Sequence, residues 1–142
     1  MQERDLDLGG DPVGALVHRV GAQHQHIGAG LLGTAFTMEQ DFYIDRLAAA
    51  GLIVLTPPAD DRALVHRVIY DELCLGIVTE ESRTAYGAVI GRLVAAGAEG
   101  VILGCTEIEL LVGPDDCPVP VFPTTRLHVA AAVDYALTGT IH

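Results

Sequence analysis

The feature that most constrains this chain is its alternation of short apolar runs with longer amphipathic segments. This alternation is typical of a parallel β-sheet whose strands are joined by helices. We therefore predict an α/β fold in which residues 1–142 form one domain around a parallel, roughly four-stranded sheet flanked by helices. The expected strands are the apolar runs Ile27–Gly33, Leu52–Leu55, Val101–Gly104 and Pro118–Phe122.

The segments between these runs carry the start signals of helices. A loose acidic lead-in over residues 1–10 is followed by Asp11-Pro12, the order of an N-cap and a proline at the first helical position. Two segments have the form of a capping box, Thr37-Met38-Glu39-Gln40 and Thr106-Glu107-Ile108-Glu109. Helices are expected from Pro12 to about Gly21, from Thr37 to near Gly51, from Asp60 towards a turn at Gly76, from Thr79 to about Gly97, from Thr106 onwards, and from Thr125 to Leu137.

The charge balance limits the partners. Lys and Arg total 8 against 19 Asp and Glu, which gives a net charge of −11. A phosphate-binding surface requires the opposite balance, so nucleic acid is not expected as a partner. Because the same excess repels anions, an acidic ligand has to be held by local donors such as helix N-termini and backbone N–H groups.

The amino terminus and the cysteines indicate the compartment. The first residues lack the basic-then-apolar order of a signal peptide, and no apolar run approaches the roughly 20 residues of a membrane span. We therefore expect a cytoplasmic protein without a membrane partner. Its three cysteines contain no Cys-x-x-Cys pair or zinc-finger spacing, so we expect reduced thiols rather than disulfides or structural zinc.

Cys105 is the strongest candidate for a catalytic residue. It falls between the predicted strand Val101–Gly104 and the predicted helix from Thr106, and ligands of parallel α/β sheets bind at such turns. The positive end of a helix dipole would lower the pKa of this thiol and supply a thiolate as base or nucleophile. The alternative is a small, inert, buried side chain at a strand end. The turn Gly33–Thr37 is the second of this type.

Other cysteines and histidines carry weaker signals. Cys74, at a helix end, and Cys117, beside a proline, are expected to be structural or incidental. His24 and His26 could share a strand face, but no Cys or carboxylate near them completes a metal site, so we predict no metal. Surface or partly buried core positions are expected for the remaining helical histidines, His18, His66 and His128.

Two glycine patterns have alternative explanations. Residues 28–33 match G-x-G-x-x-G, but these glycines precede and enter a strand instead of following it, so we do not expect a dinucleotide. Gly87 and Gly91 share one helix face, which allows close approach either of a neighbouring subunit or of the sheet.

Four segments resemble the aspartate/glutamate racemase family, in its aspartate racemase branch. The stretch 100–111, GVILGCTEIELL, resembles the second catalytic-cysteine motif of that family. The stretches 31–43, 65–76 and 121–128 resemble further segments of the family in the expected order. The racemase-like region covers residues 28–137 and corresponds to the C-terminal half of these enzymes.

The resemblance implies a function and a site. Family members have two similar α/β domains that face each other across the active site, with one catalytic cysteine from each. One thiolate removes the α-proton of an acidic amino acid while the opposed thiol protonates the other face, without pyridoxal phosphate or metal. Cys105 would be one such thiol, and Thr106, Glu107, Thr34 and Thr37 would hold the substrate.

This chain departs from the family pattern in two places and differs from the glutamate racemase branch in a third. The first domain, with its own cysteine motif, has no counterpart here, so the second face would come from another subunit of a homo-oligomer or from a separate N-terminal-type domain. Pro123 stands where the family has an acid, and Glu107 where the glutamate racemase branch has a histidine. Two alternatives stay open: a decarboxylase that protonates a carbanion with a single thiol, and a domain that catalyses nothing. A pKa of Cys105 no lower than that of free cysteine would favour the second alternative.

Overall fold

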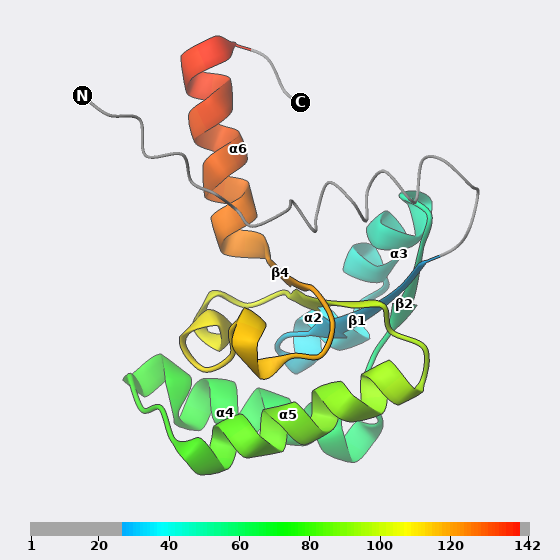
Figure 1. The fold of residues 1–142 in the computed structure, drawn as a ribbon, viewed down its shortest axis with the longest axis vertical. Helices are drawn as coiled ribbons and strands as arrows, with labels where there is room; N and C mark the ends of the chain where they lie inside the picture. The colour runs from blue at the N-terminus through cyan, green and yellow to red at the C-terminus, as the bar shows by residue number, and fades with distance from the viewer. Residues whose placement is uncertain (1–26, 140–142) are drawn as a thin grey trace.

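The fold is built around four parallel strands. In a computed structural model, which describes residues 27–139, the strands are β1 (Ile27–Leu32), β2 (Leu52–Leu55), β3 (Gly100–Leu103) and β4 (Val121–Pro123). Their order in the sheet is β2-β1-β3-β4, and each neighbouring pair is parallel (Figure 1). The predicted α/β class and four-stranded sheet are confirmed. The lead-in, the helix predicted from Pro12 to Gly21, and His18, His24 and His26 lie outside the described residues.

Helices and short turns connect the strands. The helices are α2 (Ala35–Glu39), α3 (Asp41–Ala49), α4 (Ala59–Asp71), α5 (Glu80–Ala95) and α6 (Thr124–Thr138), and the 3₁₀ turns are η1 (Leu73–Leu75), η2 (Thr106–Leu110) and η3 (Pro114–Asp116). Thr79 caps α5 by accepting from Ser82 N, as predicted. The predicted turn at Gly76 is also present, and the backbone of Gly76 adopts the left-handed conformation there.

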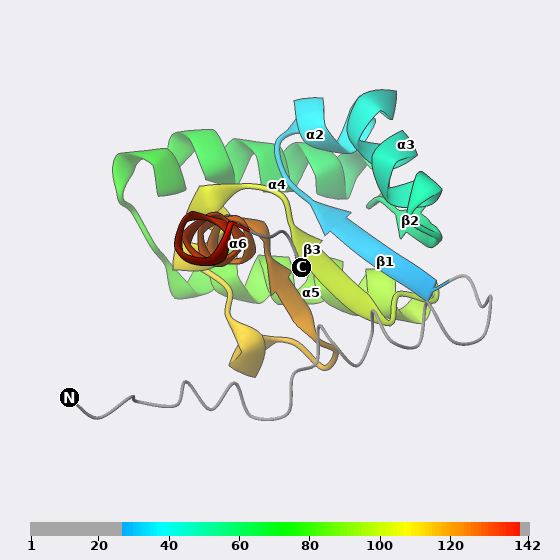
Figure 2. The same cartoon turned by 90° about the horizontal axis from the view of Figure 1, so that it is seen from above.

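Alternate residues of the central strands feed two apolar layers. Leu32, Val101 and Leu103 face the core formed with α4 and α5, while Leu31 and Ile102 face the layer that includes α3. Figures 1 and 2 show α4 and α5 together beneath the sheet and α3 on its other side. Because both faces of β1 are covered, all six of its residues are buried.

The glycines of β1 serve packing. A Cβ on Gly28 would lie 2.3 Å from the carbonyl oxygen of Gly97, and one on Gly30 would lie 3.1 Å from Leu93. These glycines therefore let the strand approach the end of α5, and they lie within β1 itself. This position explains the G-x-G-x-x-G pattern without a nucleotide.

The start of the second predicted helix was assigned three residues too late. Thr34, not Thr37, is the N-cap, and its hydroxyl accepts from Thr37 N. The expected continuous helix is also broken at Gln40, whose backbone is extended, so that α2 and α3 are separate. Thr34 and Thr37 both fit an N-cap by residue type, and the sequence pattern alone does not decide between them.

The last helix projects from the body. In the part of the chain that the structure describes, α6 has no buried residue, and Leu137 is 81% exposed. Figure 1 shows this helix standing away from the sheet and from α4 and α5. It follows that α6 is held mainly through its first residues, next to β4.

The glycine pair of α5 faces open space. A Cβ on Gly87 or Gly91 would meet nothing within 4 Å, so close packing on the sheet, one of the two explanations offered for this pair, is wrong.

Because glycine costs helix stability when nothing requires it, Gly91→Ala is expected to raise the free energy of unfolding by about 0.5–1 kcal/mol. Urea denaturation followed by circular dichroism measures this change, and a decrease would mean that the position needs a glycine.

Candidate active site

The candidate site lies where β1 and β3 end side by side. Leu32 pairs with Leu103, and Gly104 N donates to the Leu32 carbonyl at 2.7 Å. A Cβ on Gly104 would lie 3.2 Å from Cγ2 of Thr37, so the glycine lets the two turns touch. The two turns therefore lie side by side, with Thr37 in one and Cys105 in the other.

Cys105 is a half-buried thiol paired with a carboxylate. Its Sγ donates a hydrogen bond to Oε2 of Glu107 at 2.9 Å. Burial, together with this bond and the negative charge of Glu107, raises the pKa of Cys105 to about 11. The predicted lowering of this pKa is therefore wrong.

The cause of this correction is local. The segment after Cys105 is a 3₁₀ helix of five residues, which offers only a small dipole, and the Cys105 side chain makes no cap hydrogen bond. The predicted capping box is not formed, and Oε2 of Glu109 is buried without a partner among the described residues. The nearest strong electrostatic influence is Glu107, which favours the neutral thiol.

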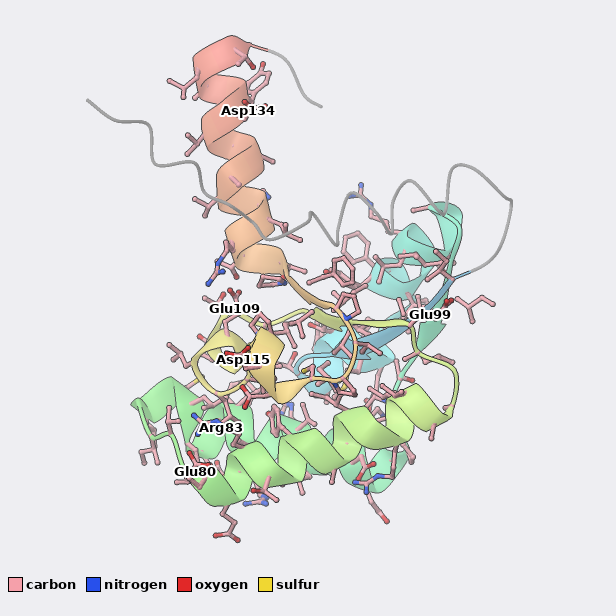
Figure 3. The ribbon with its side chains drawn as sticks, viewed as in Figure 1. Glu80, Arg83, Glu99, Glu109, Asp115 and Asp134 are labelled. Atoms are coloured by element: carbon pink, nitrogen blue, oxygen red, sulfur yellow. The ribbon has the colours of Figure 1, made fainter. Side chains whose placement is uncertain are left out.

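Neighbouring elements hold the η2 segment in place. Arg83 of α5 donates from Nε to the Leu111 carbonyl at 2.9 Å and pairs with Glu80 (Figure 3). The buried Ile108 and Leu111 join the main core. The backbone that follows Cys105 is therefore held both by a hydrogen bond from α5 and by packing in the core.

The opposite turn already uses two of its N–H donors. Ala35 N donates to Nδ1 of His66 at 2.9 Å, and Thr37 N donates to Oγ1 of Thr34 at 3.4 Å. The hydroxyls of Thr34 and Thr37 are 3.4 Å apart. Free donors for an acidic ligand at this turn are consequently fewer than the sequence suggested.

A third strand end completes the site, and the sequence analysis missed its residues. Thr124 Oγ1 donates to the Leu103 carbonyl at 2.7 Å, and Thr125 Oγ1 donates to Thr106 Oγ1 at 3.2 Å. A shallow pocket beside them is lined by Thr106, Thr124, Thr125, His128 and Val129. The sequence did carry a signal for these residues, because Thr124 and Thr125 follow a strand whose end lies at the same edge of the sheet.

Pro123 ends β4 and occupies the N-cap position of α6. Proline offers no side-chain acceptor, and no side-chain cap hydrogen bond is formed there. The Thr124 hydroxyl is bonded to β3 instead, which anchors the first turn of α6.

The remaining thiols lie elsewhere. Cys74 is exposed on η1, and Cys117 is half-buried after η3 with a pKa raised to about 11 by burial and by Asp116. Among residues 27–139, no group of three or more His, Cys, Asp or Glu side chains could hold a metal ion. No helix in the same range is long and apolar enough to cross a membrane.

The Glu107 carboxylate should control the reactivity of Cys105. Glu107→Gln removes a negative charge and the strongest acceptor of the thiol proton, so the pKa of Cys105 is expected to fall from about 11 and its alkylation by iodoacetamide at pH 8 to accelerate several-fold. Mass spectrometry across a pH series measures this rate at Cys105. Glu109→Gln, which changes a carboxylate in the same turn without a bond to the thiol, is the control and should leave the profile unchanged.

Comparisons with known proteins identify the family of this chain. Residues 12–132 match the family described as Asp/Glu/Hydantoin racemase. A curated, uncharacterised protein encoded in the 3′ region of pnlA in Pectobacterium carotovorum subsp. carotovorum is 35% identical over 83 residues, which make up 58% of this chain and 54% of that protein.

Solved structures show the same fold. A candidate Asp/Glu racemase from Yersinia pestis matches with a TM-score of 0.77 and 52% identity, over 88% of this chain and 54% of that one. An aspartate racemase homologue from Pyrococcus horikoshii OT3 gives 0.73 and 30% over the same shares. Picrophilus torridus aspartate racemase, at 21% identity and a TM-score of 0.61 over 85% of this chain and 50% of that one, is similar in fold. This chain spans about half the length of these proteins.

Proposed function

Since the chain belongs to the Asp/Glu/Hydantoin racemase family, we propose that it provides one half of an active site that inverts the α-carbon of a small acidic amino acid without a cofactor, with Cys105 as one catalytic thiol. The observation that carries this proposal is the Cys105–Glu107 pair, which stands where β1 and β3 end together. A thiol bonded to a carboxylate has both a proton to deliver and a group to receive it.

Glu107 gives the thiol a path to its reactive form. Proton transfer from Sγ to the carboxylate would leave a thiolate that takes the α-proton and becomes a thiol again, and the protonated Glu107 would release its proton to water before the next turnover. Because the pKa of Cys105 is about 11 in this chain, the thiolate is a minor species at neutral pH. A bound substrate ammonium would stabilise the thiolate and neutralise Glu107, so we expect the pKa to fall when the substrate binds.

Threonine hydroxyls supply the uncharged donors for an acidic substrate. The hydroxyls of Thr34 and Thr37 contact each other in the turn after β1, and Thr106 joins Thr125 from the β4 side. Hydroxyl groups can donate to a carboxylate without adding positive charge, in keeping with a chain of net charge −11. We propose that these hydroxyls hold the substrate carboxylates.

The second face of the substrate requires another acid or base. Inversion needs groups on opposite sides of a planar carbanion, and Cys105 serves one side only. We propose that a second copy of this chain or a separate N-terminal-type domain supplies the other group. The chain spans about half the length of the solved relatives it matches.

The raised pKa of Cys105 favours a second candidate for the chain on its own. A thiol that stays protonated at neutral pH is an acid, suited to protonating a carbanion from one face. Decarboxylation of an arylmalonate-type acid uses this step. By the criterion stated for the sequence, however, the same pKa favours a domain that catalyses nothing over both enzymes, so catalysis by the isolated chain should be weak.

The test is α-proton exchange in deuterium oxide. Purified chain is incubated with L- and D-aspartate or glutamate over a range of protein concentrations, with and without the part of the Yersinia pestis protein that lies outside the match. Proton NMR measures deuterium at the α-carbon, and chiral chromatography measures inversion. Exchange with inversion supports the racemase. If no mixture shows either exchange or inversion, the racemase proposal is contradicted. Carbon dioxide release from phenylmalonate would identify the single-thiol alternative.

A further inference from the structure

One histidine makes a contact that the proposed chemistry does not explain. His66 lies on α4, yet its Nδ1 accepts from the backbone N–H of Ala35, the first residue of α2, at 2.9 Å. The two residues are 31 positions apart in the sequence. The hydrogen bond therefore connects helix α4 to the turn at which β1 ends.

The ring is prepared to accept this bond. A donor N–H opposite Nδ1 requires that nitrogen to be unprotonated, which leaves the proton of the neutral ring on Nε2. The Tyr70 ring, one turn further along α4, packs against the imidazole with 4.8 Å between ring centroids. Tyr70 thus limits the rotation of the acceptor.

The tethered turn is also the one that touches Gly104, the residue before Cys105. Thr34, directly before Ala35, caps α2 through Thr37, and the Thr37 side chain packs against Gly33 and Gly104. Met38 anchors the same short helix in the core with 1% of its surface exposed. A displacement of the first turn of α2 would therefore move the Thr34 and Thr37 hydroxyls and release the contact with Gly104.

A second contact joins α4 to the other end of α2, and comparing the two contacts shows which end of α2 is held more firmly. Arg62 of α4 pairs with Glu39 at the other end of α2 at 3.3 Å, but 53% of the Glu39 side chain is exposed. An exposed pair holds geometry weakly, whereas His66 satisfies a backbone donor at the start of the helix. The first residue of α2, Ala35, is held by the histidine.

We propose that His66 is a positioning residue, which fixes the turn between β1 and α2 so that Thr34 and Thr37 stand at the Cys105 turn. Its value for catalysis rests on the proposed function, while its effect on the turn does not. His66 acts through Ala35, and no contact with the substrate is required.

The experiment compares two substitutions at this position. His66→Leu removes the acceptor, whereas His66→Asn keeps an oxygen, Oδ1, as many bonds from the backbone as Nδ1 is. Glu39→Gln, which breaks the other link to α4, is the matched control. Amide hydrogen exchange by NMR at Ala35, Thr37 and Gly104, and KM and kcat for α-deuterium incorporation with the mixture that proves active, are measured for each variant.

In His66→Leu, exchange at Ala35 and Thr37 should accelerate about tenfold and KM should rise about tenfold, with kcat changed by less than about twofold. His66→Asn should restore most of both, and Glu39→Gln should resemble the unmodified chain. Unchanged exchange at Ala35 and Thr37 in His66→Leu, or equal behaviour of the leucine and asparagine variants, would overturn the proposal. If no mixture exchanges the α-proton, the proposed function fails, and amide exchange alone decides the role of His66.

Discussion

Replacing Cys105 by alanine is expected to reduce α-deuterium incorporation by at least about 10³-fold, because acid–base catalysis by a positioned group contributes about 10²–10⁴-fold and no other thiol is bonded to Glu107 among the described residues. The measurement is the initial rate in deuterium oxide with the active mixture. Cys105→Ser, which keeps a hydroxyl but not the acidity of a thiol, should be nearly as inactive.

Cys117 provides a matched control for this substitution. It too is half-buried, with a pKa raised to about 11, but it lies after η3 and outside the described contacts of the site. Cys117→Ala should keep the exchange rate within about twofold, as expected for a group that makes no contact with the substrate. Comparable losses in the Cys105 and Cys117 variants would show that the cysteines matter for folding and not for catalysis.

Gly28→Ala is expected to lower the free energy of unfolding by about 3 kcal/mol, at the upper end of the usual cost of overpacking a core. The added methyl would lie 2.3 Å from the Gly97 carbonyl oxygen, a backbone atom that cannot rotate away. Relief would require β1 to move from the end of α5, and β1 pairs with both β2 and β3. Urea denaturation of the variant measures the loss.

The comparison with Gly91→Ala separates the effect of close packing from the effect of replacing any glycine by alanine. Both changes add one methyl group to a glycine, but the methyl at Gly91 meets nothing within 4 Å while that at Gly28 meets backbone. Opposite signs in the two variants are therefore expected. A stable Gly28→Ala chain would contradict the close approach between β1 and Gly97.

The sheet could be predicted because its signals are local and independent of one another. Each strand is a short apolar run, and β3 begins and ends within one residue of its predicted bounds. Thr79 and Gly76 were also found, because an N-cap hydroxyl and a left-handed glycine act within a few residues of chain. The last strand begins three residues later than predicted, since its pairing with β3 starts at Val121.

The errors at the site arise from contacts that are distant in sequence or depend on geometry. The start of α2 is fixed with help from His66, which no local pattern connects to Ala35. The residue types after Cys105 permit a helix, but the chain forms a short 3₁₀ turn that brings Glu107 to the thiol. The direction of the Cys105 pKa shift depends on that turn. The sequence pattern therefore singled out Cys105 but predicted the wrong direction for its pKa shift.

The strand order also sets the sequence of events while the chain is being made. Ala29 pairs with Gly100 across most of the domain, so one edge of β1 must wait for β3 after β2 has joined the other. Long-range parallel pairing is slow, and an unpaired strand edge invites association with other chains. Because the Thr34 and Cys105 turns flank this late pairing, a nascent chain that stops before Gly100 would carry an aggregation-prone edge, and the proposed site would form only once β3 had paired with β1.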